Sequence, residues 1–245
     1  MSAARDQILA RIRAANGSAG LTAGGGQAAS QRAGRAADAD AAYATLARRY
    51  LRAHHDPAAH DIAALFAERA ADYRAVVERV PGPGPAALAA AVARVLAGRV
   101  AAVPGPVLVP DGLPADWLTG LAGQITLARD EPPLPSASLD RAAGVVTGCA
   151  VAVAETGTII LDHGRGQGRR ALTLVPDFHL VVVREDQVAA DLADAFARLD
   201  PARPHTLISG PSATSDIELI RVEGVHGPRN LHVLLTGPGQ GDGGM

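Results

Sequence analysis

The feature that most constrains the fold is a series of short apolar runs that begins after Val100 and continues almost to the end of the chain. Segments with helical spacing of apolar side chains lie between several of the runs, which is the pattern of strands alternating with helices. Such alternation across about 140 residues predicts an α/β architecture, with a sheet covered by helices on both faces. The expected strands are 107–109, 125–127, 145–154, 158–161, 180–183, 207–208 and 231–235, and the expected helices are 116–121, 188–199 and 216–221.

One pair of runs has the composition of a β-hairpin. The stretch 149–155 is followed by Thr156-Gly157, a dipeptide suited to a tight turn, and then by the run 158–161. Two antiparallel strands joined by a short connection fit this order. We therefore expect a hairpin that interrupts the alternation of strands and helices.

The first hundred residues carry helical patterns instead of strands. Residues 2–15 place Ile8, Leu9 and Ile12 on one face of a short amphipathic helix, and residues 43–51 predict a second helix. Between them, residues 20–39 contain almost no large apolar side chain, so burial cannot offset the entropy lost on ordering. The expected organisation is an N-terminal helical extension with a flexible linker over 1–56, an α/β domain over 57–237 and a disordered tail over 238–245.

Two stronger helices are expected where the domain begins. Asp61 is placed to cap the first, whose apolar side chains recur at helical spacing as far as Val80. Pro85 suits the first turn of the second, and Gly98 is expected to end it.

Composition excludes several classes of function. The 23 basic residues are all Arg, and they are balanced by 25 acidic residues without a basic block that could follow a phosphate backbone, so nucleic acid is not an expected partner. Cys149 is the single cysteine, which rules out an internal disulfide or a Cys-rich cage and fits a reducing cytosol. With no uninterrupted run of about 18 apolar residues, we expect no membrane span and a cytoplasmic location.

Glu155, in the predicted hairpin turn, is the first candidate functional residue. It lies among apolar residues, and a carboxyl group that faces inward would be desolvated, which raises its pKa and suits proton exchange or nucleophilic attack. The alternative is a hairpin-end carboxylate in water, with Thr156 and Gly157 serving only the turn.

The second candidate is the segment 209–218, where a strand, a Gly-Pro turn and several hydroxyls precede a predicted helix start. Backbone amides near Gly210 and Ser212, with the Ser212 and Thr214 hydroxyls, could hold a phosphate or carboxylate. The alternative is a capping box from Ser215 to Glu218, in which Asp216 complements the helix dipole.

His226, in a turn bounded by glycines, is the third candidate and would suit acid–base chemistry near neutral pH, although a lone loop histidine is usually only exposed. The Gly- and Arg-rich stretch 162–170 could act as a flap that brings guanidinium groups to an anion, or could simply be a solvated loop. Cys149 itself is most simply a buried small hydrophobe.

Three motifs together resemble a known family. AETGTIIL at 154–161, SGPSATSDIE at 209–218 and GVHGP at 224–228, in this order and followed by LHVLL, resemble the LUD-domain family and, within it, the lactate utilisation protein C (LutC/YkgG) group. The resemblance covers residues 60–237, and the N-terminal helix fits the same group. It implies a three-layer mixed α/β fold like that of ribose-5-phosphate isomerase and CoA transferases.

The resemblance also implies a function: oxidation of L-lactate to pyruvate together with partner proteins, its A and B members, that carry iron–sulfur clusters. This chain would be the subunit that binds no cofactor itself. The expected site has Glu155, His226 and Asp216 as catalytic groups, and Thr156, Gly157, Gly210, Ser212 and Thr214 as ligand-binding groups around a small anionic metabolite, without a metal.

Two other functions stay open. One is a stand-alone enzyme on a CoA-linked or phosphorylated metabolite, because Glu155-Thr156-Gly157 resembles the Glu-Asn-Gly turn of CoA transferases, with Thr in place of Asn. The other is a binding protein that senses a ligand of the same pathway.

Overall fold

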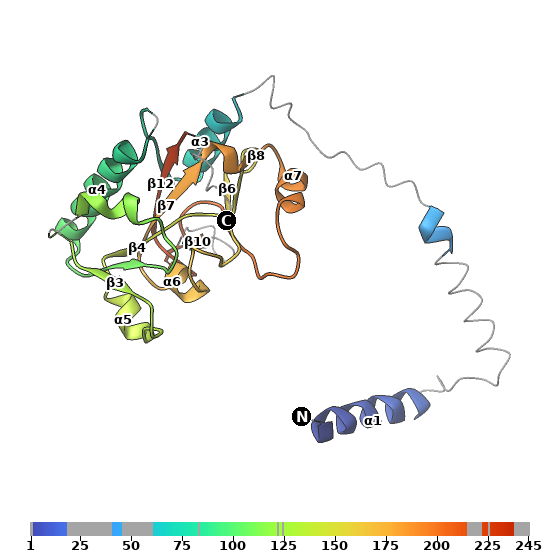
Figure 1. The fold of residues 1–245 in the computed structure, drawn as a ribbon. Coiled ribbons are helices and arrows are strands. Elements are labelled where there is room, and N and C mark those ends of the chain that lie inside the picture. Colours follow the sequence, from blue (N-terminus) through green and yellow to red (C-terminus); the bar gives the residue numbers. More distant parts are fainter. Residues whose placement is uncertain are drawn as a thin grey trace, which may run out of the picture. The chain divides into compact units, whose positions relative to one another are not determined.

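The computed structural model describes residues 2–18, 41–45, 61–82, 84–121, 123, 125–214, 222–224 and 226–237 (Figure 1). The chain divides into two compact units, residues 1–50 and 51–245. In the first, α1 (Ser2–Ser18) confirms the first predicted helix, and residues 41–45 are helical, as expected from the start of the second. The predicted linker and C-terminal tail lie outside the described residues.

A six-stranded sheet forms the centre of the second unit, and all its neighbouring strands are parallel. Parallel strands need crossover connections, which is why helical segments separate them in the sequence. The α/β architecture expected from that alternation is therefore confirmed, while the likeness to ribose-5-phosphate isomerase stays a prediction. In spatial order the strands are β1 (Val76–Arg79), β12 (Asn230–Thr236), β7 (Phe178–Arg184), β4 (Gly144–Thr147), β2 (Val107–Val109) and β3 (Leu127–Arg129).

The antiparallel pairs are in smaller sheets. The predicted hairpin is confirmed, because β5 and β6 pair antiparallel on either side of a turn in which Gly157 has a φ of 59°. The long run expected over 145–154 is two strands, since Gly148 to Ala150 carry the chain from β4 in the large sheet to β5 in the small one. The four-stranded sheet has the order β8 (Val188–Ala189), β5 (Val151–Val153), β6 (Thr158–Leu161), β9 (Thr206–Ile208), and the two-stranded one joins β10 (Ala213–Thr214) to β11 (Val222–Glu223).

Both faces of the large sheet are covered. On β7, Leu180 and Val182 pack with α4, whereas Val181 and Val183 pack with α3 and the four-stranded sheet. Each such side chain is fully buried and contributes about 1.5–3 kcal/mol of hydrophobic free energy. Figure 1 shows α4 on one side and α7 beyond the smaller sheet. The helices are α3 (Ile62–Asp72), α4 (Pro85–Ala102), α5 (Ser136–Asp140), α6 (Arg170–Leu174) and α7 (Leu192–Ala197), with 3-10 turns η1 (Ala115–Leu121) and η2 (Glu185–Gln187).

The helix expected from Asp61 to Val80 is wrong in its second half. Asp61 does cap α3, accepting a hydrogen bond from the Ala64 N–H at 2.9 Å. The helix ends at Asp72, Arg74 adopts a positive φ of 70°, and residues 76–79 are strand β1. Apolar spacing fits both structures here, and pairing of β1 with β12 decides for the strand.

The expectation that Gly98 ends α4 is also wrong, because the helix continues to Ala102. Pro85 lies at its start as predicted, and the buried face formed by Leu88, Val92 and Leu96 holds the helix against the sheet. This packing outweighs the cost of about 1 kcal/mol for a glycine inside a helix. By length and hydropathy alone α4 is also the one helix among the described residues that could span a membrane, but that same apolar face is used in the core.

Smaller shifts have similar causes. Strand β3 covers 127–129 instead of 125–127, and α7 begins at Leu192 because Val188 belongs to β8. The predicted helix 216–221 lies outside the part of the chain that the structure describes.

Candidate functional site

The Glu155 turn is held by packing, and its carboxyl group faces water. Glu155 is exposed, and its backbone N–H donates to the Ala190 carbonyl at 3.1 Å. The inward orientation that would desolvate this carboxyl group is therefore not found. Gly157 fits closely against α3, since a Cβ at this position would lie 2.4 Å from the Ala70 nitrogen. Position 157 of this turn therefore requires glycine, which has no Cβ and tolerates a positive φ.

A chain of hydroxyl groups joins this turn to the second candidate segment. Thr156 Oγ1 lies 2.7 Å from Thr158 Oγ1, which in turn lies 2.8 Å from Ser209 Oγ. The next residue, Gly210, also adjoins α3, because a Cβ there would lie 2.6 Å from Cβ of Tyr73. Two of the predicted segments therefore meet at the C-terminal end of α3.

Ser212 links the second segment to the third. Its side-chain oxygen accepts a hydrogen bond from the His226 N–H at 3.0 Å, and its carbonyl accepts one from the Gly224 N–H at 3.0 Å. Its own N–H donates to the Pro228 carbonyl at 2.8 Å. The expectation that the Ser212 amide holds an anion is therefore wrong, because that donor is already used. The structure does bring Ser212 and His226 together, as the sequence predicted.

The remaining predicted residues are only partly described. Thr214 lies in β10 opposite Val222, and Asp216 lies outside the described residues. Ser209 and Ser212 are three residues apart, so at most about 11 Å of chain separates the hydroxyl chain from the Ser212–His226 contact. The hydroxyl chain and the Ser212–His226 contact are therefore neighbours through the short segment 209–212.

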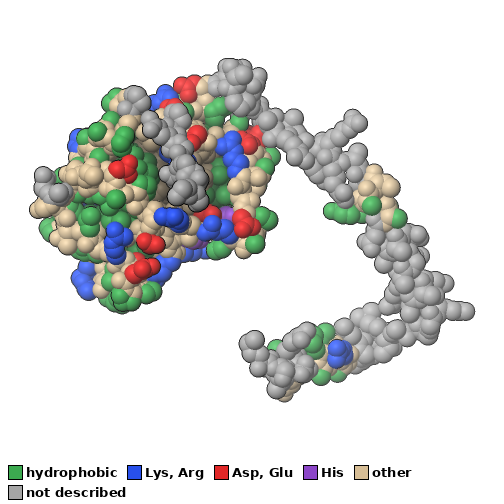
Figure 2. Space-filling view, in the orientation of Figure 1, with side chains coloured by type: hydrophobic (Ala, Val, Ile, Leu, Met, Phe, Trp, Pro, Cys, Tyr) green, Lys and Arg blue, Asp and Glu red, His purple; other side chains and the backbone are tan. Residues whose placement is uncertain are grey.

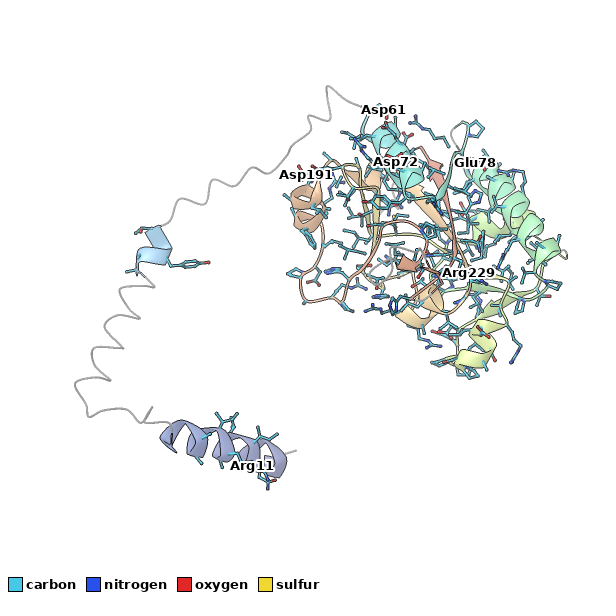
Figure 3. All side chains as sticks on the ribbon, turned by 180° about the vertical axis from the view of Figure 1, so that it is seen from behind. Arg11, Asp61, Asp72, Glu78, Asp191 and Arg229 are labelled. Atoms are coloured by element: carbon cyan, nitrogen blue, oxygen red, sulfur yellow. The ribbon has the colours of Figure 1, made fainter. Side chains whose placement is uncertain are left out.

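Beside this contact lies a cavity of about 580 Å³, here called the amino-edge pocket. Asp177 precedes β7 and Arg229 precedes β12, so the pocket lies where the parallel strands begin. Strands β5 and β9, which precede the first two candidate segments, belong to the small sheet and do not end at this pocket. Figure 3 shows Arg229 away from Glu78 of β1 and from Asp61, which accepts a hydrogen bond from Arg79 at the end of that strand. The lining residues are Asp140, Arg170, Leu174, Val175, Asp177, Gly224, His226, Gly227 and Arg229.

In the amino-edge pocket, Asp177 forms ion pairs, whereas Arg170 forms none with the described residues. Asp177 binds Arg229 at 2.6 Å and Arg99 at 3.4 Å. Burial alone would raise the pKa of the Asp177 carboxyl group, but the hydrogen bond and charge of Arg229 and the charge of Arg99 hold it below its ordinary value. The exposed Arg170 has no ion pair with any residue that the structure describes, which leaves a guanidinium group available beside His226.

A second cavity, of about 800 Å³, lies where strands β2 and β3 end and is here called the carboxyl-edge pocket. Sequence reasoning singled out only the stretch 162–170 within it. The missed signal is that Pro110-Asp111 and Asp130-Glu131 directly follow β2 and β3. Basic and acidic side chains are interspersed over β3, β10 and α6 in Figure 2. The pocket is lined by Pro110, Asp111, Arg129, Asp130, Glu131, Pro132, Pro133, His163, Gly164, Arg165, Gly168, Arg169, Leu172 and Arg203.

A cysteine and a histidine, Cys149 and His179, are buried in the core. Cys149 is buried, as expected, and burial raises the pKa of its thiol to about 12. Burial also lowers the pKa of His179 to about 3, and this neutral imidazole lies 2.8 Å from Thr147 Oγ1. Among the described residues, no group of three or more His, Cys, Asp or Glu side chains could hold a metal ion.

Comparison with known proteins places the chain in a family. The LUD domain model matches residues 136–236. Lactate utilization protein C of Deinococcus radiodurans is 52% identical over 176 residues, which cover 70% of this chain and 78% of that protein. The corresponding protein of Geobacillus kaustophilus is 32% identical over 54% of this chain and 63% of its own length.

A solved structure agrees. The crystal structure of a DUF162 family protein from Deinococcus radiodurans superposes with a TM-score of 0.58 at 43% identity, covering 72% of this chain and 97% of that one. The motifs, the fold and these relatives lead to one assignment. The chain belongs to the LUD-domain family, within its lactate utilisation protein C group.

Proposed function

We propose that this protein acts in L-lactate utilisation as the cluster-free subunit of a cytoplasmic system that oxidises L-lactate to pyruvate. The observation that carries the proposal is its 52% identity to the Deinococcus lactate utilization protein C over 78% of that protein. The partners in this proposal are iron–sulfur proteins that resemble the A and B members of the lactate utilisation system.

The division of labour follows from the chemistry. Oxidation of a hydroxyl carbon to a ketone releases two electrons and two protons, and the electrons in this scheme pass to clusters in the partners. Iron–sulfur clusters are typically held by four cysteine thiolates. A single buried cysteine whose pKa is raised to about 12 does not fit this requirement. The proposed contribution of this chain is therefore binding and orientation of an anion.

The amino-edge pocket is the proposed site for the carboxylate of the metabolite. Arg170 offers an exposed guanidinium group, which binds carboxylates well through paired N–H donors. His226 lines the same pocket, and its backbone N–H donates to Ser212; in this proposal its ring takes up the hydroxyl proton. Thr156, Gly157, Gly210 and Thr214 contribute in this proposal by shaping the adjoining turns, and Asp216 and Glu155 are candidates for a second proton acceptor.

A stand-alone enzyme on a CoA-linked or phosphorylated metabolite has less support. That reading needs Glu155 as a nucleophile in a water-excluding pocket, and Glu155 is exposed in a hairpin turn. We therefore keep the multi-protein system as the proposed function.

The test has a genetic and a biochemical part. We expect deletion of the gene to abolish growth on L-lactate with growth on pyruvate unchanged, and the tagged full chain to co-purify with cluster-bearing partners. Undiminished growth on lactate, or the absence of any cluster-bearing partner, would contradict the proposal.

The site is tested with Arg170→Gln and His226→Gln in the same background. Both variants should lower lactate oxidation by the purified system at least tenfold, since each loses one charge-assisted contact or the proton acceptor. Arg198→Gln is the matched control, because Arg198 follows α7, binds Asp194 and lines neither of the two cavities. Wild-type activity in both pocket variants would exclude this pocket and leave the broader function intact.

A further inference from the structure

The order of strands in the large sheet contains a reversal between β2 and β4. From β2 the chain crosses through η1 to β3, on one side of the pair, and from β4 it proceeds to β7, on the other side. The two connections also pack on opposite faces, because η1 lies with α4 whereas α6 lies with the cluster around Leu108 and Val145. In open α/β sheets a crevice forms outside the carboxyl ends of strands at such a reversal, and ligands bind there.

The loop 162–168 closes the floor of this crevice. Gly166 N–H donates to the Asp111 carbonyl after β2 at 2.8 Å, and the Gly166 carbonyl accepts from Gly148 N–H after β4 at 2.9 Å. Gly112 permits the close approach of the loop, because a Cβ there would lie 2.9 Å from Cβ of Arg165. Gly166 thus connects the carboxyl ends of β2 and β4, directly beside the carboxyl-edge pocket.

The loop is pre-organised by its own side chains. The Gln167 side chain accepts from the Asp162 N–H at 2.8 Å and donates to the Asp162 carboxylate at 2.7 Å. His163 contacts the Gly168 carbonyl at 3.1 Å through Nδ1 and Thr206 Oγ1 at 3.0 Å through Nε2. The flexible flap considered from the sequence is therefore a fixed wall, and a fixed wall lowers the entropy cost of binding.

The arginines of the carboxyl-edge pocket fall into two classes. Arg169 binds Asp130 through two hydrogen bonds of 2.6 and 3.0 Å, and Arg203 binds Asp162 at 2.9 Å. The hydrogen bond from Arg169 holds the pKa of Asp130 below its ordinary value, so this pair stays ionised and its charges cancel. Arg129 and Arg165 line the same pocket and have no ion pair with any residue within the described part of the chain.

The rest of the lining defines the class of ligand. Pro110, Pro132, Pro133 and Leu172 offer apolar contact to a carbon skeleton. Asp111 and Glu131 offer acceptors for hydroxyl or amino groups. We propose that the carboxyl-edge pocket binds a hydroxyl- or amino-bearing metabolite whose phosphate or carboxylate group is held by Arg129 and Arg165. This site is separate from the amino-edge pocket and does not depend on the proposed function.

Titration calorimetry on the full chain tests this, with inorganic phosphate and succinate as probes at constant ionic strength. At least one probe should bind, and the Arg129→Gln/Arg165→Gln double variant should weaken that binding at least tenfold because two charge-assisted contacts are lost. Phosphate binding alone would identify the ligand as a phosphate ester, and succinate binding alone as a carboxylic acid. Both arginines are exposed, so the double variant should keep the unliganded unfolding midpoint of the wild type.

Arg198→Gln is the control for the loss of a surface charge. Arg198 is exposed and lines neither pocket, so this variant should leave phosphate and succinate affinity unchanged. Absence of binding by both probes, unchanged affinity in the double variant, or an equal loss in Arg198→Gln would each overturn the assignment. None of these outcomes bears on lactate oxidation or on the partners, so failure here is distinguishable from failure of the proposed function.

Discussion

The two edges of the central sheet differ in how their polar residues are used. The amino edge contains the sequence motifs, yet the Ser212 amide, the Ser212 hydroxyl and the His226 amide are already hydrogen-bonded within the protein. The carboxyl edge contains, of the segments singled out from the sequence, only the stretch 162–170, yet Arg129 and Arg165 there lack an ion pair within the described residues. A glycine- and serine-rich motif can therefore mark close packing as well as a ligand site, and the strand order supplies information that motifs do not.

The largest effect should come from the packed turn on the amino side. Gly157→Ala places a Cβ 2.4 Å from the Ala70 nitrogen in a residue with a positive φ, so the free energy of unfolding should fall by about 3 kcal/mol. Urea denaturation would measure the loss. Gly98→Ala is the control, because its Cβ meets nothing within 4 Å inside a helix and should stabilise by about 0.5–1 kcal/mol. Equal effects of both changes would show that this turn is not fixed by α3.

Acid should destabilise the domain through His179, near the start of β7. Its folded pKa of about 3 lies below the unfolded value of about 6.5, so the unfolded state gains a proton first as the pH falls. Stability should be unaffected by this group above pH 7 and should drop by about 2 kcal/mol between pH 7 and pH 5.

The matched variant is Thr147→Val/His179→Leu, which removes both partners of the buried hydrogen bond and so leaves neither unpaired. Urea denaturation at both pH values should show a flatter dependence than the wild type. An identical slope would assign the acid sensitivity between pH 7 and pH 5 to other groups.

The smallest effect should come from Ser212→Ala. Loss of the hydrogen bond from the His226 N–H should lower the free energy of unfolding by about 1 kcal/mol. The same change should reduce lactate oxidation by more than this stability loss explains, because the position of His226 is no longer fixed. Ser136→Ala, at an exposed position of α5, should alter neither quantity. A stability loss without an activity loss would make Ser212 a purely structural residue.

Local patterns predicted the elements that local physics decides. Asp61 as a helix cap, Pro85 in a first turn and the hairpin around Thr156-Gly157 all follow from short-range preferences, and all three are confirmed. The prediction for residues 76–79 was wrong because their apolar spacing fits a helix and a strand equally. The strand that decides, β12, lies about 150 residues away in the chain.

The site was harder to predict for the same reason. Ser212 and His226 are close in sequence, and both were expected around one site. The carboxyl-edge pocket combines residues near 110, 130, 163 and 203, which only the strand order brings together. Arg129 carries no local signal, since it is one exposed arginine at the end of a three-residue strand.

The position of β12 has a consequence for how the protein is made. Among the described residues this strand comes last along the chain, but it lies between β1 and β7 and pairs with both. While the chain is being synthesised, β1 has no neighbour, and its exposed backbone groups wait until residues 230–236 leave the ribosome. Pairing of β1 with the sheet is therefore a late event, and a chain that stops before residue 230 lacks the strand that pairs with both β1 and β7.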